Sequence, residues 1–480
     1  MTIRIYNTLS GRKEPFSPLT DNHVKMYVCG PTVYDSSHIG HARSVVVFDM
    51  VARYFRDSGF EVTYVRNFTD VDDKIIQRAN ELGLAPETLA ATYIDEFHED
   101  MDALNVERAS HEPRATEYIE QMIRFIERLI EMGLAYAVDG DVFYAVEHFK
   151  PYGKLSGRRL EDMSAGARVD VDPRKRNPSD FALWKSAKPE EPAWPSPWGP
   201  GRPGWHIECS AMSSHLLGTT FDIHGGGKDL IFPHHENEIA QSEGVSGATF
   251  ARYWMHNGFV NIDHEKMSKS LGNFLLIKDV LSRHHPEAVR LFLLSNHYRS
   301  PIDYTAQNLV EAETGLDKIY ATLKRLNEAL QATSDEASAP TSNPIYNRFR
   351  EAMDDDFNSA QGIGVLFDAV RAVNRLLDNH PAPQGAELLS EARTLKDAIE
   401  RMGAVLGVPA MVPIDYFDRK QAQAIVEKAV DPEQIESLVA KRSQARKAKD
   451  WAAADRIRDE LQAIGVTIED TAQGTVWKLT

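Results

Sequence analysis

Residues 26–43 of this 480-residue chain read Met-Tyr-Val-Cys-Gly-Pro-Thr-Val-Tyr-Asp-Ser-Ser-His-Ile-Gly-His-Ala-Arg, and this stretch decides the fold. The alternation from Met26 to Cys29 predicts the end of a buried strand, which Gly30 and Pro31 terminate. Residues 42–55 predict a helix with one apolar face. A ligand between a strand end and a helix N-terminus meets free backbone N–H groups and a positive dipole. The stretch therefore predicts a site for a polyphosphate.

Two histidines lie in the loop that joins this strand to this helix. His38 and His41 are three residues apart, so they point the same way in a helical turn. Gly40 between them leaves room for a nucleotide, and two neutral imidazoles offer donors to phosphate oxygens. A single His-x-Gly-His string also occurs in surface loops that bind nothing, so this segment alone leaves both interpretations open.

A second segment carries two ammonium groups and two hydroxyls: Lys266-Met267-Ser268-Lys269-Ser270. These groups can grip a pyrophosphate leaving group as its charge develops. An isolated segment of this kind is more often a solvated run of charge. Its position after the His-Ile-Gly-His loop favours the functional interpretation.

Together the two segments resemble the two signature motifs of the class I aminoacyl-tRNA synthetases. The resemblance covers nearly the whole chain and is closest to the cysteinyl-tRNA synthetase family, through Cys29-Gly30-Pro31-Thr32-Val33-Tyr34, Gly204-Trp205-His206-Ile207-Glu208-Cys209-Ser210 and His224-Gly225-Gly226-Gly227. It implies that ATP binds to His38, Gly40, His41, Lys266 and Lys269. All of these except Gly40 are expected to be catalytic.

The length and composition suit a soluble, multi-domain enzyme. A chain of 480 residues is too long for one core, and 42% apolar with 26% charged residues is typical of globular proteins. No apolar stretch predicts a signal peptide or a membrane span, and two cysteines fit a reducing cytosol. The net charge of −17 argues against a nucleic-acid partner, but such a partner needs only a local basic strip.

The element pattern predicts an α/β fold with a Rossmann-type parallel sheet, a connective insertion, a helical bundle and a small C-terminal domain. The expected boundaries are 1–110 and 204–304 for the two halves of the catalytic domain, 111–203 for the insertion, 305–410 for the bundle and 411–480 for an anticodon-binding domain. Further expected strands are 61–67, 142–146, 221–224, 466–469 and 475–479. Further expected helices are 72–82, 118–132, 286–295, 433–449 and 451–464, with one opening at 233–238. We expect a stiff link at 189–204, a glycine turn at 225–227 and a loop at 332–344.

Four scattered residues form a candidate metal site: Cys29, Cys209, His234 and Glu238. His234 and Glu238 are four apart, so both can face one ion, but His235 has an equally compatible spacing. Buried thiols with a helix-capping His-Glu pair are the alternative, and a disulfide between the cysteines is a weaker one. The resemblance implies one zinc ion per chain, with Mg²⁺ accompanying ATP.

Zinc has a clear purpose in an enzyme specific for cysteine. A steric pocket separates cysteine from serine poorly, whereas zinc favours a bound thiolate over a hydroxyl. Discrimination of the order of 10⁵ needs about 7 kcal/mol, at roughly 1.4 kcal/mol per decade. The residues expected to contact the cysteine substrate are Gly30, Thr69, Trp205, His206, His224 and Asp229. Two acidic residues follow Thr69 in the sequence, Asp70 and Asp72. They either line the pocket or cap the next helix.

The C-terminal domain offers a candidate contact with RNA. Five of the ten residues from 441 to 450 are Lys or Arg, although a solvated charged face is the default for such a run. Trp451 can stack on an unpaired base. The resemblance implies anticodon contacts in this domain, and we assign them to Arg446, Asp455 and Asp470.

The resemblance implies a cysteine–tRNA ligase with ATP, L-cysteine and tRNA(Cys) as partners, and the composition adds the expectation of a cytoplasmic protein without membrane contact. One alternative is a related ligase that joins cysteine to an amino-sugar amine, which lacks a tRNA-binding end such as Gln473-Gly474-Thr475-Val476-Trp477. The other is a non-catalytic RNA- or thiol-binding protein, which would not need both lysines of the 266–270 segment.

Overall fold

The computed structural model describes residues 2–159, 172–262, 265–266, 274–331, 343–381, 383–428, 430–471 and 474–479. The chain divides into two compact units, which are described separately. The first comprises Met1–Ile319 and Ala329–Ala410, and the second comprises Tyr320–Glu328 and Met411–Thr480.

The strands are β1 Arg4–Asn7, β2 Arg12–Pro15, β3 His23–Val28, β4 Glu61–Arg66, β5 Ala135–Val138, β6 Asp141–Tyr144, β7 Phe181–Ser186, β8 Gly201–Pro203, β9 Phe221–Gly227, β10 Ala251–Asn257, β11 Val260–Ile262, β12 Glu265–Lys266, β13 Ile302–Tyr304, β14 Val466–Thr471 and β15 Gly474–Leu479. The α-helices are α1 Ile39–Asp57, α2 Asp73–Leu82, α3 Pro86–Ala103, α4 Ile119–Glu131, α6 Trp205–Leu217, α7 His234–Ser246, α8 Ile277–Leu281, α9 Pro286–Leu294, α10 Ala306–Gln331, α11 Pro344–Asp354, α12 Ser359–Asn379, α13 Ala386–Leu406, α14 Pro413–Lys428, α15 Pro432–Lys447 and α16 Trp451–Ala463. Short 3-10 helices cover Ala115–Tyr118, Val146–His148 and Lys228–Ile231.

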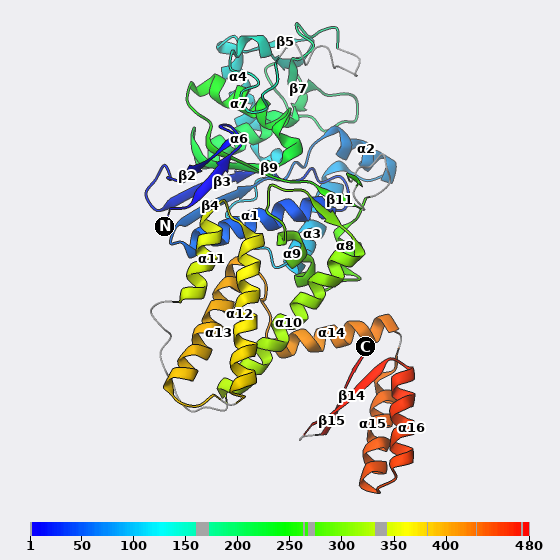
Figure 1. Ribbon diagram of the computed structural model, residues 1–480. Helices are drawn as coiled ribbons and strands as arrows, with labels where there is room; N and C mark the ends of the chain where they lie inside the picture. The colour runs from blue at the N-terminus through cyan, green and yellow to red at the C-terminus, as the bar shows by residue number, and fades with distance from the viewer. Residues whose placement is uncertain are drawn as a thin grey trace. The chain divides into compact units, whose positions relative to one another are not determined.

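The first unit is built on a four-stranded sheet in the order β10-β9-β3-β4, in which every neighbouring pair is parallel. Helix α1 covers one face of this sheet, and α6 and α7 cover the other (Figure 1). The chain moves outward from β3 to β4 on one side and from β9 to β10 on the other. The switch point therefore lies between β3 and β9, and ligands of such sheets bind at the carboxyl ends of the strands beside it. The α/β prediction is confirmed.

Helix α1 forms where the apolar periodicity predicted a helix. The predicted apolar face, Val45, Phe48, Ala52 and Phe55, is buried, and so are Val46, Val47, Met50 and Val51, so the middle of the helix is buried on nearly all sides. His38 is the N-cap, and its imidazole accepts a hydrogen bond from the backbone N–H of His41. The predicted helix began at residue 42, but this cap lets it start three residues earlier, directly after the loop.

The region expected to be an insertion contains its own antiparallel sheet, in the order β5-β6-β7-β8. Two sequence-based expectations were wrong, one for β8 in this sheet and one for β9 in the parallel sheet. Part of the predicted stiff link is strand β8, which pairs with β7, and the predicted glycine turn at 225–227 is the end of β9. In β9 a side chain on Gly225 would clash with the Phe48 ring at 2.4 Å, so the glycine serves packing.

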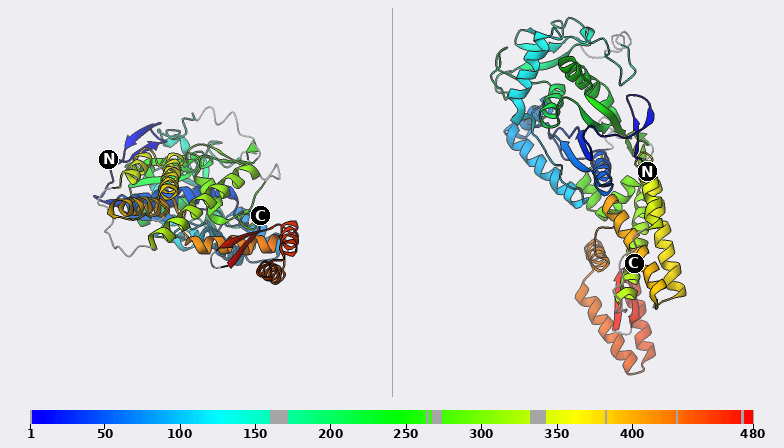
Figure 2. Two further views of the ribbon diagram at one scale, coloured as in Figure 1. Left: turned by 60° about the horizontal axis from the view of Figure 1, so that its bottom comes forward. Right: turned by 90° about the vertical axis from the view of Figure 1, so that its left-hand side faces the viewer.

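The helices after β13 include three that pack side by side: α11, α12 and α13 (Figures 1 and 2). Arg290 on α9 ties them to the sheet domain. It is fully buried, pairs with Asp49 of α1 and donates to the carbonyl oxygens of Leu406, Leu104 and Asn105. The expected loop at 332–344 lies outside the described residues up to 342, and α11 begins at Pro344.

Replacing Arg290 with methionine should destabilise the first unit by at least about 2 kcal/mol, because the carbonyl oxygens of Leu406 and Leu104 lose this buried donor, whereas Asp49 keeps Arg53 as an ion-pair partner. Urea unfolding followed by circular dichroism measures this change. The matched control is Arg124→Ala, which breaks an ion pair with Glu120 whose side chains are 71% and 76% exposed. That change should cost less than about 1 kcal/mol. Equal effects of the two variants would contradict the prediction.

The second unit has a small core in which α15 and α16 pack against the antiparallel pair β14–β15. Ile435, Leu461 and Trp477 are buried there, and the Trp477 indole N–H donates to Glu436 at 2.7 Å. Both helices and the strand pair correspond to the predicted elements. Within the described part of the chain, no helix combines the length and the apolar character needed to cross a membrane.

Candidate functional site

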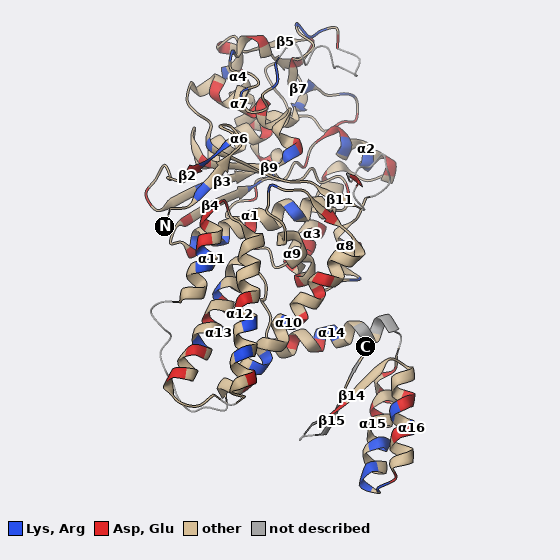
Figure 3. Ribbon diagram, in the orientation of Figure 1, with Lys and Arg blue, Asp and Glu red and all other residues tan. Residues whose placement is uncertain are grey.

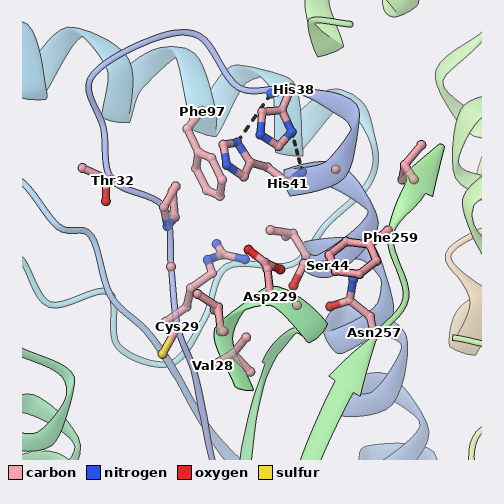
Figure 4. Close-up of a pocket in the computed structure, with 18 of the residues that line it drawn as sticks. Val28, Cys29, Thr32, His38, His41, Ser44, Phe97, Asp229, Asn257 and Phe259 are labelled. Carbon is pink, nitrogen blue, oxygen red and sulfur yellow. Dashed lines mark hydrogen bonds between the residues drawn. The ribbon is translucent and has the colours of Figure 1, made fainter. Parts of the chain in front are cut away.

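A cavity of about 380 Å³ opens at the carboxyl ends of β3 and β9, at the switch point of the sheet. It brings together the loop after β3, the start of α1, residues 227–230 and residues 257–260. Figure 4 shows Cys29, His38, His41 and Asp229 around it. The His-Ile-Gly-His loop and Cys29, the first candidate metal ligand, therefore line one pocket.

His38 and His41 are held as a stacked pair at the N-terminus of α1. Their ring centroids are 3.6 Å apart, and each Nδ1 accepts a hydrogen bond from the backbone N–H of the other residue, at 3.2 and 3.5 Å (Figure 4). Phe274 packs edge-on against His38, with ring centroids 4.6 Å apart. The capping bonds fix the orientation of both rings at the positive end of the helix dipole, where an anionic group is stabilised.

The segment that follows the predicted lysine loop is hydrogen-bonded to the histidine loop. The backbone N–H of Ile39 donates to Leu275, and that of Ile277 donates to Ser37. Lys266 is the last residue of β12, whereas Lys269 lies outside the described residues. Residues 275–277 therefore lie beside the histidine loop.

Four side chains converge next to the pocket: Cys29 after β3, Cys209 on α6, and His234 and Glu238 on the first turns of α7. Their ligand atoms all lie within 4.8 Å of one another. Cys29 Sγ is 3.7 Å from Cys209 Sγ and 3.4 Å from Glu238 Oε1, which in turn is 3.0 Å from His234 Nε2. Two thiols, an imidazole and a carboxylate at this spacing form a set that can hold a metal ion.

Neighbouring histidines hold the outer atoms of this set. His224 Nε2 lies 2.7 Å from Glu238 Oε2, so the other carboxylate oxygen faces the thiols. His206 Nδ1 lies 2.9 Å from His234 Nδ1, and the other ring nitrogen, His234 Nε2, faces Glu238 Oε1 inside the set. In metal sites, the side chains that bind the metal are commonly oriented by hydrogen bonds from surrounding residues in this way. The structure contains a second possible set that shares two members: Cys29, His224, His235 and Glu238.

The side chains of this cluster shift one another's pKa values. Burial opposes the ionisation of Cys209, but hydrogen bonding with Cys29 and the nearby His234 outweigh it and lower the pKa of Cys209 to about 6. Burial likewise opposes the charging of His234, but Glu238 and Cys209 raise its pKa to about 10. The pKa of Cys29 is raised by burial and by Cys209. The cluster thus favours a thiolate beside a compensating positive charge, which a metal cation also supplies.

Three of the six residues predicted to contact substrate line the pocket: Gly30, Trp205 and Asp229. Gly30 leaves no room for a side chain, because a Cβ would lie 1.6 Å from the carbonyl oxygen of Asn67. Trp205 stacks on His234 at 4.2 Å and stays 38% exposed.

The other three are not among the residues that line the pocket. His224 and His206 contact Glu238 and His234 from behind, as described above. The Thr69 hydroxyl donates to Glu208 Oε2 at 2.7 Å in a buried contact. Of the two acidic residues that follow Thr69, Asp72 caps α2 and Asp70 accepts from Thr116.

Sequence reasoning missed several lining residues, among them Arg66, Phe97, Asn257 and Phe259. Arg66 and Asn257 end strands β4 and β10, so their position at the carboxyl edge of a parallel sheet was an available signal. Phe97 lies on α3 and carries no motif, so only its packing places it here.

In the second unit, Lys and Arg residues occur along α15 towards its C-terminal end, where the ribbon is blue (Figure 3). Asp470 accepts from Arg442 and Arg446 and from the Thr475 hydroxyl, and these contacts hold its pKa well below its usual range. Asp455 pairs with Arg458 at 3.4 Å and is 64% exposed. Arg446 and Asp470 are therefore neighbours, and the carboxylate of Asp470 already accepts hydrogen bonds from two arginine side chains.

Comparisons with known proteins give a consistent result along the chain. Residues 15–314 match the family of class I (C) tRNA synthetase catalytic domains, residues 348–410 match the DALR domain, and residues 432–477 match the cysteinyl-tRNA ligase anticodon binding domain. The cysteine–tRNA ligases of Trichlorobacter lovleyi and Geobacter sulfurreducens are each 56% identical over the full length of both chains.

Solved structures show the fold alone. The methionyl-tRNA synthetase of Mycobacterium tuberculosis in complex with methionyl-adenylate superimposes with a TM-score of 0.61 at 15% identity, covering 82% of this chain and 93% of that one. A leucyl enzyme from Agrobacterium radiobacter superimposes with a TM-score of 0.57 at 12% identity, covering 83% and 87%.

Proposed function

The chain belongs to the cysteinyl-tRNA synthetases, a family of class I aminoacyl-tRNA synthetases, and we propose that it activates L-cysteine with ATP and transfers it to tRNA(Cys). The cysteine carboxylate attacks the α-phosphate of ATP, which forms cysteinyl-adenylate and releases pyrophosphate. A ribose hydroxyl at the 3′ end of the tRNA then takes the cysteinyl group and releases AMP. The enzyme acts in the cytoplasm.

One observation carries this proposal: a single pocket contains both the His38–His41 pair at a helix N-terminus and Cys29 of the metal-binding cluster. The first suits the phosphates of a nucleotide, and the second suits the thiol of cysteine. A pocket that holds both reactants can bring a carboxylate and an α-phosphate together, and positioning of this kind supplies much of the rate.

The metal in the cluster is zinc, held by Cys29, Cys209, His234 and Glu238. The donor set supports this choice, since thiolate and imidazole ligands suit zinc and a carboxylate completes four positions. The position of His234 Nε2, buried and 3.0 Å from Glu238 Oε1 among the other donor atoms, also fits a ligand atom. Zinc, when bound, favours the thiolate of cysteine over the hydroxyl of serine, which is much harder to deprotonate. Mg²⁺ accompanies ATP.

The remaining residues bind and orient. His38 and His41, with Gly40, contact the triphosphate, and their rings are already fixed by mutual capping. Lys266 and Lys269 neutralise charge on the pyrophosphate as it leaves. Trp205 and Asp229 contact the cysteine substrate from the pocket wall, and Asp229 pairs with the ammonium group.

The domains have separate tasks. Residues 1–110 and 204–304 form the catalytic domain, 111–203 the connective insertion, 305–410 the helical bundle and 411–480 the anticodon-binding domain, with Arg446, Asp455 and Asp470 at the anticodon. The match of residues 432–477 to an anticodon binding domain favours this function over the ligation of cysteine to an amino sugar.

Aminoacylation of a tRNA that bears the cysteine anticodon tests the proposal directly. We expect charging with cysteine, no charging with serine, and ATP–pyrophosphate exchange that depends on cysteine. An amino-sugar ligase would perform the exchange but leave the tRNA uncharged. Absence of cysteine-dependent exchange would contradict both enzymatic functions and leave a binding protein.

The variant Lys269→Ala should slow adenylate formation by roughly 10²- to 10³-fold, because it removes charge stabilisation that develops in the transition state. Cysteine affinity should stay nearly unchanged. Rapid-quench measurement gives the rate of adenylate formation, and a cysteine titration gives the affinity for cysteine, so the two effects are measured separately. An equal loss in cysteine affinity would mean that the segment has a structural role instead.

A further inference from the structure

Arg66, the last residue of β4, lies in the wall of the pocket with its side chain only 1% exposed. One of its guanidinium nitrogens, Nη2, donates to Glu112 Oε1 at 2.5 Å. The other two, Nε and Nη1, are buried and have no hydrogen-bond partner. The guanidinium lies 5.1 Å from the ring of Phe97 and 5.9 Å from that of Tyr64. The Tyr64 hydroxyl also interacts with this guanidinium, but Nε and Nη1 make no hydrogen bond of normal geometry, so much of the hydrogen-bonding capacity of Arg66 is unused.

Buried donors in native proteins nearly always have partners, so unused donors at a pocket wall call for an explanation. Arginine presents its N–H groups as a planar fork that matches a carboxylate or a phosphate. Among the residues that the structure describes, Glu112 is the one ion-pair partner of Arg66. Its second oxygen is taken by His98 at 3.0 Å.

Arg66 also lies beside the backbone that carries the candidate metal ligand. It is in register with Val28, the residue before Cys29. A Cβ placed on Gly30 would lie 3.4 Å from Arg66 Cγ, so the arginine stem packs against the chain directly after Cys29. The same pocket contains Asp229, which offers the opposite charge. A zwitterionic amino acid with a thiol would find a partner for each of its three groups.

We propose that Arg66 binds an anionic group of the reactants, either the carboxylate of cysteine or the α-phosphate to which that carboxylate becomes joined. This inference rests on the proposed function and adds a substrate-positioning residue to it. The two sources share one chemistry, a planar or tetrahedral oxyanion that accepts hydrogen bonds from the guanidinium fork.

The test compares Arg66→Met with Glu112→Gln and with the double variant Arg66→Met/Glu112→Gln. Glu112→Gln breaks the ion pair but keeps the guanidinium in the pocket, so it reports any purely structural role of the pair. The double variant removes the guanidinium without leaving Glu112 as an uncompensated charge, and it replaces the single variant if that one does not fold. Thermal melting checks the fold of each.

The binding of cysteine is compared with that of cysteamine, which has the same thiol and amine without the carboxylate. If Arg66 binds the carboxylate, its loss should weaken cysteine binding by about 10- to 100-fold and leave cysteamine binding unchanged. If it binds the α-phosphate, cysteine binding should be unchanged, and the KM for ATP in pyrophosphate exchange should rise by a similar factor. Glu112→Gln should change none of these values appreciably.

Two results would overturn the inference. One is a folded double variant that binds cysteine and ATP as the original chain does. The other is a loss in Glu112→Gln as large as that in Arg66→Met, which would assign Arg66 to structure. Failure of the unmodified chain to show cysteine-dependent exchange would instead refute the proposed function.

Discussion

Replacing Cys209 with serine is expected to abolish binding of the proposed zinc ion and to lower kcat/KM for cysteine in pyrophosphate exchange by about 10⁴-fold. Cys209 is one of two thiols in the cluster, and its sulfur lies 3.7 Å from that of Cys29. A serine hydroxyl stays protonated near neutral pH, so it replaces a thiolate ligand poorly. Metal analysis of the purified protein, together with the exchange assay, measures both effects.

The matched control is Ser213→Ala, four residues further along the same helix. Ser213 is also fully buried, and its hydroxyl donates to a carbonyl of α6, so the substitution tests disturbance of the helix without touching a ligand. It should retain one zinc per chain and near-normal exchange. A Cys209→Ser protein that lacks zinc yet activates cysteine normally would refute the role of the metal.

Ending the chain at Asp431 is expected to abolish most tRNA charging, by about 10³-fold or more, while sparing cysteine-dependent pyrophosphate exchange. The deletion removes α15, α16 and the β14–β15 pair, which carry all the buried residues of their core, and leaves Ile425 and Val430, which pack against that core. The catalytic pocket draws its described lining from residues 28 to 274 and loses none of them. The two assays on one protein therefore separate activation from recognition.

The structure determines where this cut belongs. Our domain boundary would allow a deletion from residue 411, but Tyr416 on α14 stacks on Tyr320 at 4.0 Å, and removing it would expose that ring. A point variant, Arg446→Ala, complements the truncation, because it removes one expected anticodon contact and leaves the fold intact. A truncated, folded protein that charges tRNA as well as the full chain would place recognition elsewhere.

The sequence was sufficient for elements whose signal is local. The strand before Cys29, helix α1 and the α15–α16 pair follow from apolar periodicity and from turn residues, which act over a few positions. The hairpin β14–β15 was predicted for the same reason. The two motif segments also identified the family, since they specify chemistry independently of any folded contact.

Elements that depend on a distant partner were missed or misassigned. Strand β8 was assigned to a link because its three residues gain their strand character only by pairing with β7. The glycines of β9 were taken as a turn, although their lack of a side chain serves to admit the Phe48 ring of α1. In both cases the deciding contact joins segments that are far apart or on different elements, and residue preference does not encode it.

The sequence by itself determined the class of fold and the family, and the resemblance implied the four residues of the candidate metal set, although spacing left His234 and His235 equally open. Tertiary structure alone brought Cys29, Cys209 and Glu238 together across 180 and 209 positions of the chain. It also decided which atoms face the cluster, because His224 and His206 hold the outer sides of Glu238 and His234. Tertiary structure likewise leaves Nε and Nη1 of Arg66 without a hydrogen-bond acceptor. Sequence spacing predicts the helix or strand on which a residue lies. Only tertiary packing decides which polar atoms of its side chain form hydrogen bonds within the protein and which remain available to a ligand.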